Sequence, residues 1–384
     1  MAKALQARGH DVEVLTGFPN YPGGTVYPGY RIRWLQRECV EGVPVIRVPL
    51  YPSHDKSSIK RALNYLSFAL SSTLIGPFAT RRPDVIYVYN PMGLPGLVFK
   101  AVKRAPFVYD IQDLWPDSIA ASGMMRLGGL PLALLHRFFA HVYRSAAKII
   151  VLSPGFKRAL EERGVRPDKI EVLYNWCNED ALAADEAGSG RVGDTLEIVY
   201  AGNMGRPQAL GCVIEAARRL ESVRPRIRFT FIGGGTEVES LQAQSAGLAN
   251  VRFLAQVPQA EIGRFLQQAD ILLVHLKNAP LFAITVPSKV QFYLATGKPI
   301  LAGVSGDAAH VVRRSGGGIT FEPENVDSLM ESITRLDALA PTELCAMGRK
   351  GRDFYRKELS LATAAGRLES VLASALNHST SSAV

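Results

Sequence analysis

Short runs of β-branched and aromatic residues alternate with longer helical stretches along almost the whole chain. In the first half, strands are predicted at residues 10–17, 43–50, 83–90, 105–112 and 147–154, with helices between most of them, such as 58–75 and 130–146. Apolar runs of this length are typical of buried strands. Their alternation with helices predicts an α/β fold, in which doubly wound parallel sheets are covered by helices on both faces.

The second half repeats this pattern, with predicted strands at 195–202, 227–234, 250–255, 269–276 and 298–303. A chain of 384 residues suffices for about two domains, and the polar, glycine-containing segment 178–194 is the best linker. We therefore expect two Rossmann-like domains that face each other across a cleft. The predicted bounds are 1–178 and 195–356 for the domains, 179–194 for the linker, 357–376 for a helix that packs back toward the first domain, and 377–384 for a frayed tail.

The first domain begins in an unusual way. A doubly wound domain ordinarily opens with a strand and a glycine-rich turn that leads into its first helix. Here Met1 already stands at the start of a predicted helix, and AKALQARGH leads directly into a strand. We interpret this as a reading frame that starts late or as a fragment, and a differently arranged sheet is the alternative.

Several classes of protein are excluded by motifs that the chain lacks. The four cysteines form no C-x-x-C pair, so neither a zinc site nor a disulfide framework is expected. No H-E-x-x-H, G-x-S-x-G or Walker lysine motif occurs, and no G-x-G-x-x-G follows a strand, which argues against a dinucleotide oxidoreductase. No apolar run is long enough to span a membrane and no signal layout is visible, so we expect a cytoplasmic protein.

The positive charge of the chain is concentrated in its first half. Residues 1–178 hold 23 Lys and Arg against 13 Asp and Glu, a net charge of +10, whereas the rest carries −1. This excess favours an anionic partner, with a merely basic surface as the alternative. Nucleic acid is not expected, because no basic motif is interleaved with aromatic residues.

The predicted helix at 58–75 is apolar over much of its surface. The basic residues that flank it are Lys56, Lys60, Arg61, Arg81 and Arg82. It is either an ordinary core helix or a helix that lies at an anionic membrane surface.

Three segments that follow predicted strands of the second half could hold a phosphate, because ligands of open α/β sheets bind beyond the carboxyl ends of the strands. AGNMGRPQ (201–208) and IGGGTE (232–237) bring glycines to helix starts, and ITVPSKVQFYLATGKP (284–299) adds hydroxyls and a cation. The candidate residues are Gly202, Asn203, Gly205, Arg206, Gly233, Gly234, Gly235, Thr285, Pro287, Ser288 and Lys289. Plain turns and helix caps are the alternatives.

The first half offers an acidic cluster. YDIQDLWPDS (109–118) places Gln112, Asp113 and Asp117 around Trp115 at the carboxyl end of a strand. Such a cluster suits the binding of sugar hydroxyls or acid–base catalysis, and a helix cap at Asp113 is the alternative.

An aromatic loop follows the predicted strand at 10–17. Its aromatic residues are Phe18, Tyr21, Tyr27 and Tyr30. These rings could stack on the faces of a sugar, or the loop could pack on its own domain.

Taken together, these motifs resemble the family 4 retaining glycosyltransferases of GT-B fold, first through the P-S-K-x-x-x-Y-L-A-x-G-K-P segment at 287–299. GFPNYPGGTVYPGY (17–30), YDIQDLWPDS, AGNMG (201–205), ADILLVHLK (269–277) and TVPSK (285–289) are similar to the bacterial subgroup that contains L-fucosaminyl transferases of O-antigen and capsule assembly. The resemblance covers nearly the whole chain.

The resemblance implies a hexosyltransferase that uses a UDP-sugar, such as one carrying the N-acetylated amino sugar L-FucNAc, and a lipid-linked or glycan acceptor. The donor would bind the second domain and the acceptor the first, at the inner face of the plasma membrane. Transfer would retain the anomeric configuration, with the donor phosphate helping to accept the acceptor's proton. No metal or other cofactor is implied, because cations and helix N-termini take the diphosphate charge.

The resemblance also assigns roles to residues. Gln112, Asp113 and Asp117 would be catalytic, the phosphate candidates above would hold the donor, and the acceptor-side residues would be Phe18, Asn20, Tyr21 and Trp115.

The chain departs from the family pattern at several of these positions. Many members carry two glutamates where Ile284 and Phe292 stand, a His-Asp pair where Gln112 and Asp113 stand, and Arg and Lys where Asn203 and Gln208 stand. Arg206 and Lys289 would then be the remaining cations for the diphosphate.

Two other functions remain as alternatives. The chain could be a truncated, inactive protein that binds nucleotide sugars, because its opening glycine loop is absent. It could also be a nucleotide-sugar 2-epimerase of the same fold, which needs carboxylates and histidines in the cleft, but only His275 stands at a suitable strand end.

Overall fold

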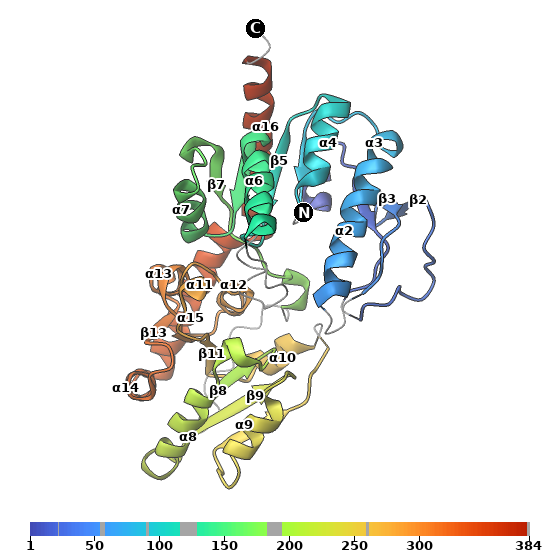
Figure 1. Ribbon diagram of the computed structural model, residues 1–384. Helices are drawn as coiled ribbons and strands as arrows, with labels where there is room; N and C mark the ends of the chain where they lie inside the picture. Colours follow the sequence, from blue (N-terminus) through green and yellow to red (C-terminus); the bar gives the residue numbers. More distant parts are fainter. Residues whose placement is uncertain are drawn as a thin grey trace. The chain divides into compact units, whose positions relative to one another are not determined.

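The computed structural model describes residues 1–21, 23–53, 58–89, 92–115, 129–182, 194–258 and 261–381 (Figure 1). The chain forms two compact units. The first unit comprises Met1–Leu173 and Ala365–Val384, and the second comprises Tyr174–Ala364. The chain thus re-enters the first unit near its end.

The second unit is built on one six-stranded parallel sheet. Its strands are β8 (Leu196–Ala201), β9 (Ile227–Ile232), β10 (Val251–Leu254), β11 (Ile271–His275), β12 (Ile300–Gly303) and β13 (Gly318–Phe321), in the order β10-β9-β8-β11-β12-β13. The chain moves outward from β8 through β9 and β10, then returns to the other side of β8 with β11. The gap between β8 and β11 is therefore a topological switch point, where open sheets bind ligands.

Helices cover both faces of this sheet. They are α8 (Gly211–Val223), α9 (Val238–Gln244), α10 (Ile262–Gln267), α11 (Pro280–Ala283), α12 (Ser288–Thr296), α13 (Gly306–Ser315), α14 (Val326–Asp337) and α15 (Pro341–Phe354), followed by a π-helix at Tyr355–Leu359. Successive residues of a strand point to opposite faces. Val199 accordingly joins an apolar cluster with residues of α12 and α13, while its neighbours Ile198 and Tyr200 join a second cluster with residues of α8 and α14.

The strands of the first unit form two sheets. The prediction of one parallel sheet for this half of the chain is therefore wrong in part. One sheet has the order β1-β3-β2, from β1 (Val14–Gly17), β2 (Gln36–Val40) and β3 (Val43–Val48). β2 runs antiparallel to β3 and was not predicted. Its two-residue turn holds Glu41 and Gly42 at positive φ, which matches the twist of a tight hairpin.

The other sheet of the first unit is parallel, in the order β4-β5-β6-β7. Its strands are β4 (Ile86–Val88), β5 (Phe107–Ile111), β6 (Lys148–Val151) and β7 (Ile170–Val172). The helices of this unit are α1 (Ala2–Gln6), α2 (Ser58–Leu74), α3 (Gly76–Ala79), α4 (Leu94–Lys103), α6 (Leu130–Ser145), α7 (Pro154–Glu162) and most of α16 (Leu361–Ser381). Glu369 of α16 accepts hydrogen bonds from Arg8 and His10, at 2.7 and 2.8 Å.

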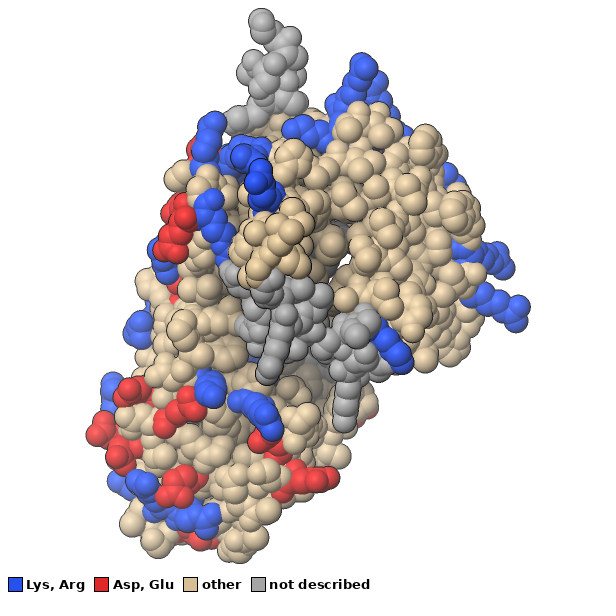
Figure 2. Space-filling model, viewed as in Figure 1, with Lys and Arg blue, Asp and Glu red and all other residues tan. Residues whose placement is uncertain are grey.

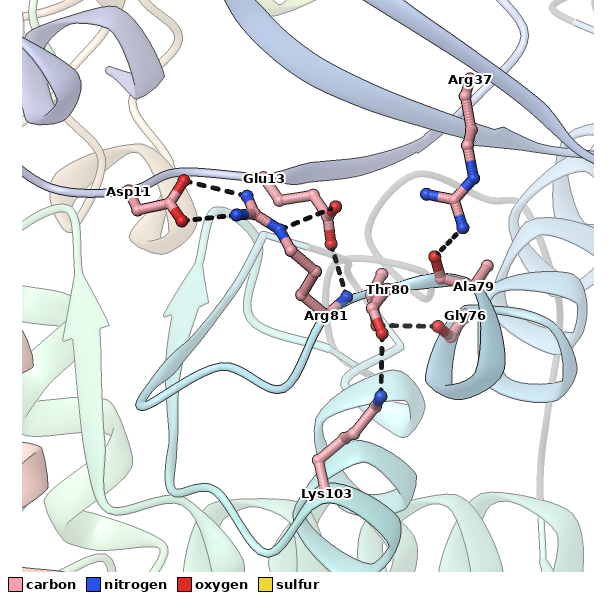
Figure 3. A network of polar contacts seen from close by, with 8 residues as sticks. All are labelled: Asp11, Glu13, Arg37, Gly76, Ala79, Thr80, Arg81 and Lys103. Carbon is pink, nitrogen blue, oxygen red and sulfur yellow. Dashed lines mark hydrogen bonds and ion pairs between the residues drawn. The ribbon is translucent and has the colours of Figure 1, made fainter.

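A polar network fixes the end of α3 (Figure 3). Arg37 of β2 donates to the carbonyl of Ala79, and Lys103 of α4 donates to the carbonyl of Thr80 at 2.9 Å. Cations suit the carbonyl end of a helix. The Arg81 guanidinium donates two hydrogen bonds to Asp11, at 2.6 and 2.9 Å, so its charge is neutralised within the unit.

Among the helices in the described parts of the chain, none combines the length and the apolar character needed to cross a membrane.

Candidate functional site

The carboxyl end of β8 is joined to α12 at the switch point of the second unit. The Tyr293 hydroxyl of α12 accepts a hydrogen bond from the Ala201 amide at 2.9 Å and donates to the Ala201 carbonyl at 3.2 Å. Tyr293 is fully buried, so this pair of bonds fixes the start of the loop after β8. Tyr293 stands in the segment at 287–299 that the sequence singles out, but the pattern assigns it no role, because it does not reveal what the hydroxyl bonds to.

Glycines allow the loops after β8 and β9 to pack backbone against backbone. A methyl group on Gly233 would lie 2.3 Å from the carbonyl oxygen of Gly202, and one on Gly235 would lie 2.3 Å from that of Met204. All three glycines have positive φ. The Met204 amide also donates to the Gly234 carbonyl at 2.7 Å. Only glycine fits these positions, so the two predicted segments are brought together as one rigid rim.

Lys289 lies against this rim. Its stem passes over Gly202, where an added methyl group would lie 2.7 Å from Cε. Its ammonium group donates to the Tyr200 hydroxyl and lies 3.7 Å from the centre of the Tyr200 ring. Burial lowers the pKa of Lys289 to about 7, because the charged form loses its water. No carboxylate compensates this cation in the contacts that the described residues make, so an anion would gain from binding there.

The start of α12 adds backbone donors beside Lys289. The helix begins at Ser288 after Pro287, and no side chain caps its first amides. Free amides and the helix dipole favour a negative charge at this end. The alternative that the Ser288 hydroxyl caps this helix is therefore wrong. The Thr285 hydroxyl donates to the Leu281 carbonyl at 2.8 Å, so Thr285 belongs to the preceding turn.

The second predicted cation, Arg206, is arranged differently. Its side chain is 91% exposed and lies 3.6 Å from a carboxylate oxygen of Glu237. The two uncharged residues near it close the loop: the Gln208 side-chain oxygen accepts from the Gly205 amide at 3.0 Å and from Asn203 at 3.4 Å. These positions therefore shape the loop and add no charge.

His275 at the end of β11 has a structural role. Its Nε2 accepts from the Glu324 amide at 3.0 Å, so Nδ1 carries the proton and donates to the Gln208 carbonyl at 2.7 Å. Burial lowers the pKa of His275, which keeps it neutral. Phe292, one of the two unusual positions, packs against the apolar core.

In the first unit, the acidic cluster centres on Asp110, which sequence reasoning missed. Asp110 is the polar residue inside β5 and is buried. It accepts hydrogen bonds from the Tyr87 hydroxyl and, at 2.7 Å, from Gln112. Burial raises the pKa of Asp110 to about 6. A carboxylate within an otherwise apolar strand was the signal that could have found it.

Asp113 follows β5 and remains exposed. Partial desolvation raises its pKa. Burial raises the pKa of Tyr89, and the charges of Asp110 and then Asp113 add to this rise. The Gln112 amide is turned to Asp110 instead. Asp117, the third predicted catalytic residue, lies outside the described part of the chain.

The aromatic candidates lie in different surroundings. Phe18 is buried, with 1% of its surface exposed, so its prediction as a sugar-stacking ring is wrong in this structure. Asn20 donates to the Phe18 carbonyl at 2.9 Å. Tyr21 is exposed, and its carbonyl accepts a hydrogen bond from the Tyr27 hydroxyl. Trp115 packs edge-on against Tyr65 of α2, with ring centres 6.0 Å apart.

Tyr30 is also held within the unit. Its hydroxyl donates to Glu38 at 3.2 Å, and the Arg47 guanidinium lies 4.9 Å from its ring centre. Within the ranges that the structure describes, no group of three or more His, Cys, Asp or Glu side chains is arranged to hold a metal ion.

Comparisons with known proteins divide the chain in a similar way. Residues 1–176 match the glycosyl transferase 4-like domain, and residues 195–338 match the glycosyl transferases group 1 domain. WcaI of Escherichia coli K12, a candidate glycosyl transferase of colanic acid biosynthesis, is 30% identical over 352 residues, which cover 87% of this chain and 86% of that protein. WbjE of Pseudomonas aeruginosa, a candidate glycosyltransferase, is 24% identical over 293 residues, which cover 73% of this chain and 72% of that protein.

The fold also has solved counterparts. The crystal structure of HepE from Anabaena in complex with UDP and glucose has a TM-score of 0.64 to this chain, with 15% sequence identity. The match covers 95% of this chain and 100% of that one.

Proposed function

Because the chain belongs to the glycosyltransferases that join a glycosyl transferase 4-like domain to a group 1 domain in the GT-B fold, we propose that it transfers a sugar from a UDP-sugar to a lipid-linked or glycan acceptor. The sugar that we propose is an N-acetylated amino sugar such as L-FucNAc. The product would be a surface polysaccharide, O-antigen or capsule, assembled at the cytoplasmic face of the membrane. The name of WcaI, which assigns that protein to colanic acid biosynthesis, supports a role in polysaccharide synthesis.

The observation that carries the donor assignment is Lys289. It is a partly buried cation with a lowered pKa, beside uncapped helix amides and two glycine loops at a switch point. A diphosphate would supply the negative charge that this position lacks, and each charge-assisted hydrogen bond contributes about 1.5–3 kcal/mol. HepE, which shares the fold, was crystallised with UDP. No resident metal or other cofactor is part of the proposal.

In the proposed reaction, the bond between the anomeric carbon and the β-phosphate oxygen of the donor breaks. The acceptor oxygen forms a new bond to that carbon from the same face, so the configuration is retained. The acceptor's proton passes to the departing phosphate oxygen. Lys289 and the α12 amides stabilise the charge that develops on the diphosphate. Asp113 of the first unit is the residue to which we assign the orientation of the acceptor hydroxyl, and Tyr21 is assigned to acceptor binding.

An assay with a panel of UDP-sugars tests the proposal. We expect UDP to bind by calorimetric titration, and one UDP-sugar to be consumed when a lipid-linked acceptor is present, with turnover unchanged in EDTA. NMR of the product then reports the anomeric configuration. Binding of UDP without turnover of any sugar would instead support a nucleotide-sugar-binding protein. Epimerised free sugar nucleotide would support the 2-epimerase.

The role of Asp113 is tested by Asp113→Asn. Loss of a group that acts on the transferred proton or hydroxyl typically lowers turnover by about 10²-fold or more. UDP affinity should stay unchanged, because Asp113 lies in the other unit from Lys289. Asp84→Asn, at an exposed carboxylate of the first unit, is the matched control. Native turnover in Asp113→Asn would reduce this residue to a structural role.

A further inference from the structure

One face of α2 is apolar and exposed. Leu63, Leu66, Leu70 and Leu74 recur at spacings of three, four and four residues, so they share one side of the helix. Phe78 of α3 follows Leu74 by four residues and is exposed as well. All five side chains are exposed, between 42 and 85% of their surface. Apolar rows of this kind on a protein surface mark places where something binds.

The opposite side of α2 is already occupied by the core. Ala69 and Ser72 are buried, and Phe68 packs on a cluster that contains Ile75. The packing of α2 on the core of the unit therefore does not use the exposed leucines. In Figure 2, the surface at the place of α2 and α3 is tan, with blue side chains at its edge and no red among them.

An exposed aromatic and basic segment precedes β2, the strand whose Arg37 bonds to the end of α3. Arg31, Ile32, Arg33 and Trp34 are all exposed, Trp34 by 72%. The following residue, Leu35, packs on the buried cluster that contains Ile75 and Ala79, and Arg37 bonds to α3, so the end of the segment is anchored to the core and to α3. Neither Arg31 nor Arg33 forms an ion pair with any residue in the described ranges.

The exposed basic residues of this surface differ in part from those expected from the sequence. Arg81 was predicted to meet the membrane, but Asp11 and Glu13 neutralise it (Figure 3). Lys56 and the side chain of Arg61 lie outside the described residues. Lys60 and Arg82, which the sequence also indicated, are exposed, and Arg31 and Arg33 add two further exposed cations.

We propose that the row on α2 and α3, with the Arg31–Trp34 segment, is a docking surface for an anionic lipid bilayer. A leaflet offers both components that this surface matches, apolar chains for the leucines and Phe78 and negative headgroups for the arginines. Trp and Arg are suited to the boundary between the two. A second copy of the same unit would instead bring together two bodies of net charge +10.

Co-sedimentation of the full chain with vesicles tests this surface. We expect binding to mixed phosphatidylglycerol–phosphatidylcholine vesicles at low salt, weak binding to phosphatidylcholine alone, and release at high salt. Leu70→Asp with Leu74→Asp should weaken binding by about tenfold or more, since buried leucines are lost. Arg31→Glu with Arg33→Glu should weaken it by about fivefold or more for each residue and remove the preference for anionic lipid.

Matched controls keep the test specific. Leu130→Asp with Leu134→Asp replaces two exposed leucines on α6 of the same unit, and Arg349→Glu with Lys350→Glu reverses two exposed charges of the second unit. Neither should change binding, and thermal unfolding shows that each variant is folded. Brominated lipid should quench the fluorescence of the native chain, and Trp34→Phe should remove most of that quenching.

Equal binding to both vesicle types, or to neither, would overturn the proposal. So would a concentration-dependent dimer that the α2 variant abolishes without any vesicle binding, because the occupant would then be a second copy. Vesicle binding needs no sugar transfer, so this result is read independently of the proposed function.

Discussion

The two units share a class of fold but present opposite surfaces. Fifteen of the sixteen large apolar side chains that are exposed in the described ranges belong to the first unit, and Val223 alone belongs to the second. The first unit carries a net charge of +10 and the second −1. Burial of apolar surface is the main driving force of folding, so its exposure on one unit only requires another reason.

The sheets inside the two units also differ. The second unit has one continuous sheet of six parallel strands, with apolar clusters on both faces. The first divides its strands between two sheets, and β2 has exposed residues along most of its length. A rigid unit suits a small ligand that must be held in a fixed position. A unit with exposed apolar and basic surfaces suits a large, deformable partner.

The largest effect is expected from a substitution in the glycine loops of the second unit. Gly233→Ala places a methyl group 2.3 Å from the Gly202 carbonyl oxygen, at a φ of +136°. We expect a loss of about 3 kcal/mol or more in the free energy of unfolding, and loss of UDP binding. Urea unfolding and calorimetric titration measure these effects.

Gly247→Ala is the control for backbone strain. Gly247 also has positive φ, at +84°, but a methyl group there meets nothing within 4 Å. We expect a loss of about 1 kcal/mol and native UDP affinity. Equal effects of both variants would mean that strain, and not the packing of the two loops, determines the site.

Asp110→Asn tests the buried carboxylate of the first unit. The folded pKa of about 6 lies above the ordinary aspartate value of 3.8, so the folded state holds the proton more tightly. Native stability should therefore fall as pH rises from about 4 to about 6, by about 3 kcal/mol in total, and stay level above that. The variant should lack this fall, as urea unfolding across the range would show. Asp84→Asn should keep the native profile, and parallel profiles in all three proteins would contradict the assignment.

Lys289→Met should lower UDP affinity by about ten- to a hundredfold near neutral pH, since one charge-assisted hydrogen bond is lost. In the native protein, free Lys289 loses its proton as pH rises through about 7, whereas a bound phosphate favours the ammonium form. Native affinity should thus fall between about pH 7 and 9, and that of the variant should not. Lys350→Met, at an exposed lysine of the same unit, should match the native protein.

Arg206→Ala should have the smallest effect. The side chain is 91% exposed, so solvent and salt screen its charge. We expect UDP affinity to fall by about threefold or less, and the difference to vanish at high salt. A loss as large as that of Lys289→Met would show that Arg206 turns inward when the donor binds.

The sequence could predict the site of the second unit because its parts occupy the ends of apolar strands. Parallel strands end at one edge of a sheet, so the segments after β8 and β9 had to lie close together. Lys289 stood out as a cation at a helix start. Tyr200 and Tyr293 did not, since a buried aromatic ring and a buried hydroxyl donor look the same in a pattern of apolar residues.

The first unit could be predicted less well for a related reason. β2 has polar and charged residues, and its pairing depends on a hairpin turn at Glu41 and Gly42 that periodicity does not reveal. Phe18 follows β1 in a turn-rich segment, which suggested an exposed ring, yet it is buried. Burial in a loop depends on contacts with distant parts of the chain, which local sequence does not encode.

The backbone contacts among Gly202, Gly233 and Gly235 have a consequence for how such chains diverge. Two side chains that touch can both be replaced, in the course of divergence, by another pair that fits. Asn203 and Gln208 are such a pair, since they close their loop without a charge. A carbonyl oxygen 2.3 Å from the place of a methyl group offers no such exchange, because every amino acid has that carbonyl. We therefore expect substitutions to accumulate around these glycines and not at them. Distant homologues should be easier to recognise by glycines separated by 31 and 2 positions than by any charged residue of the site.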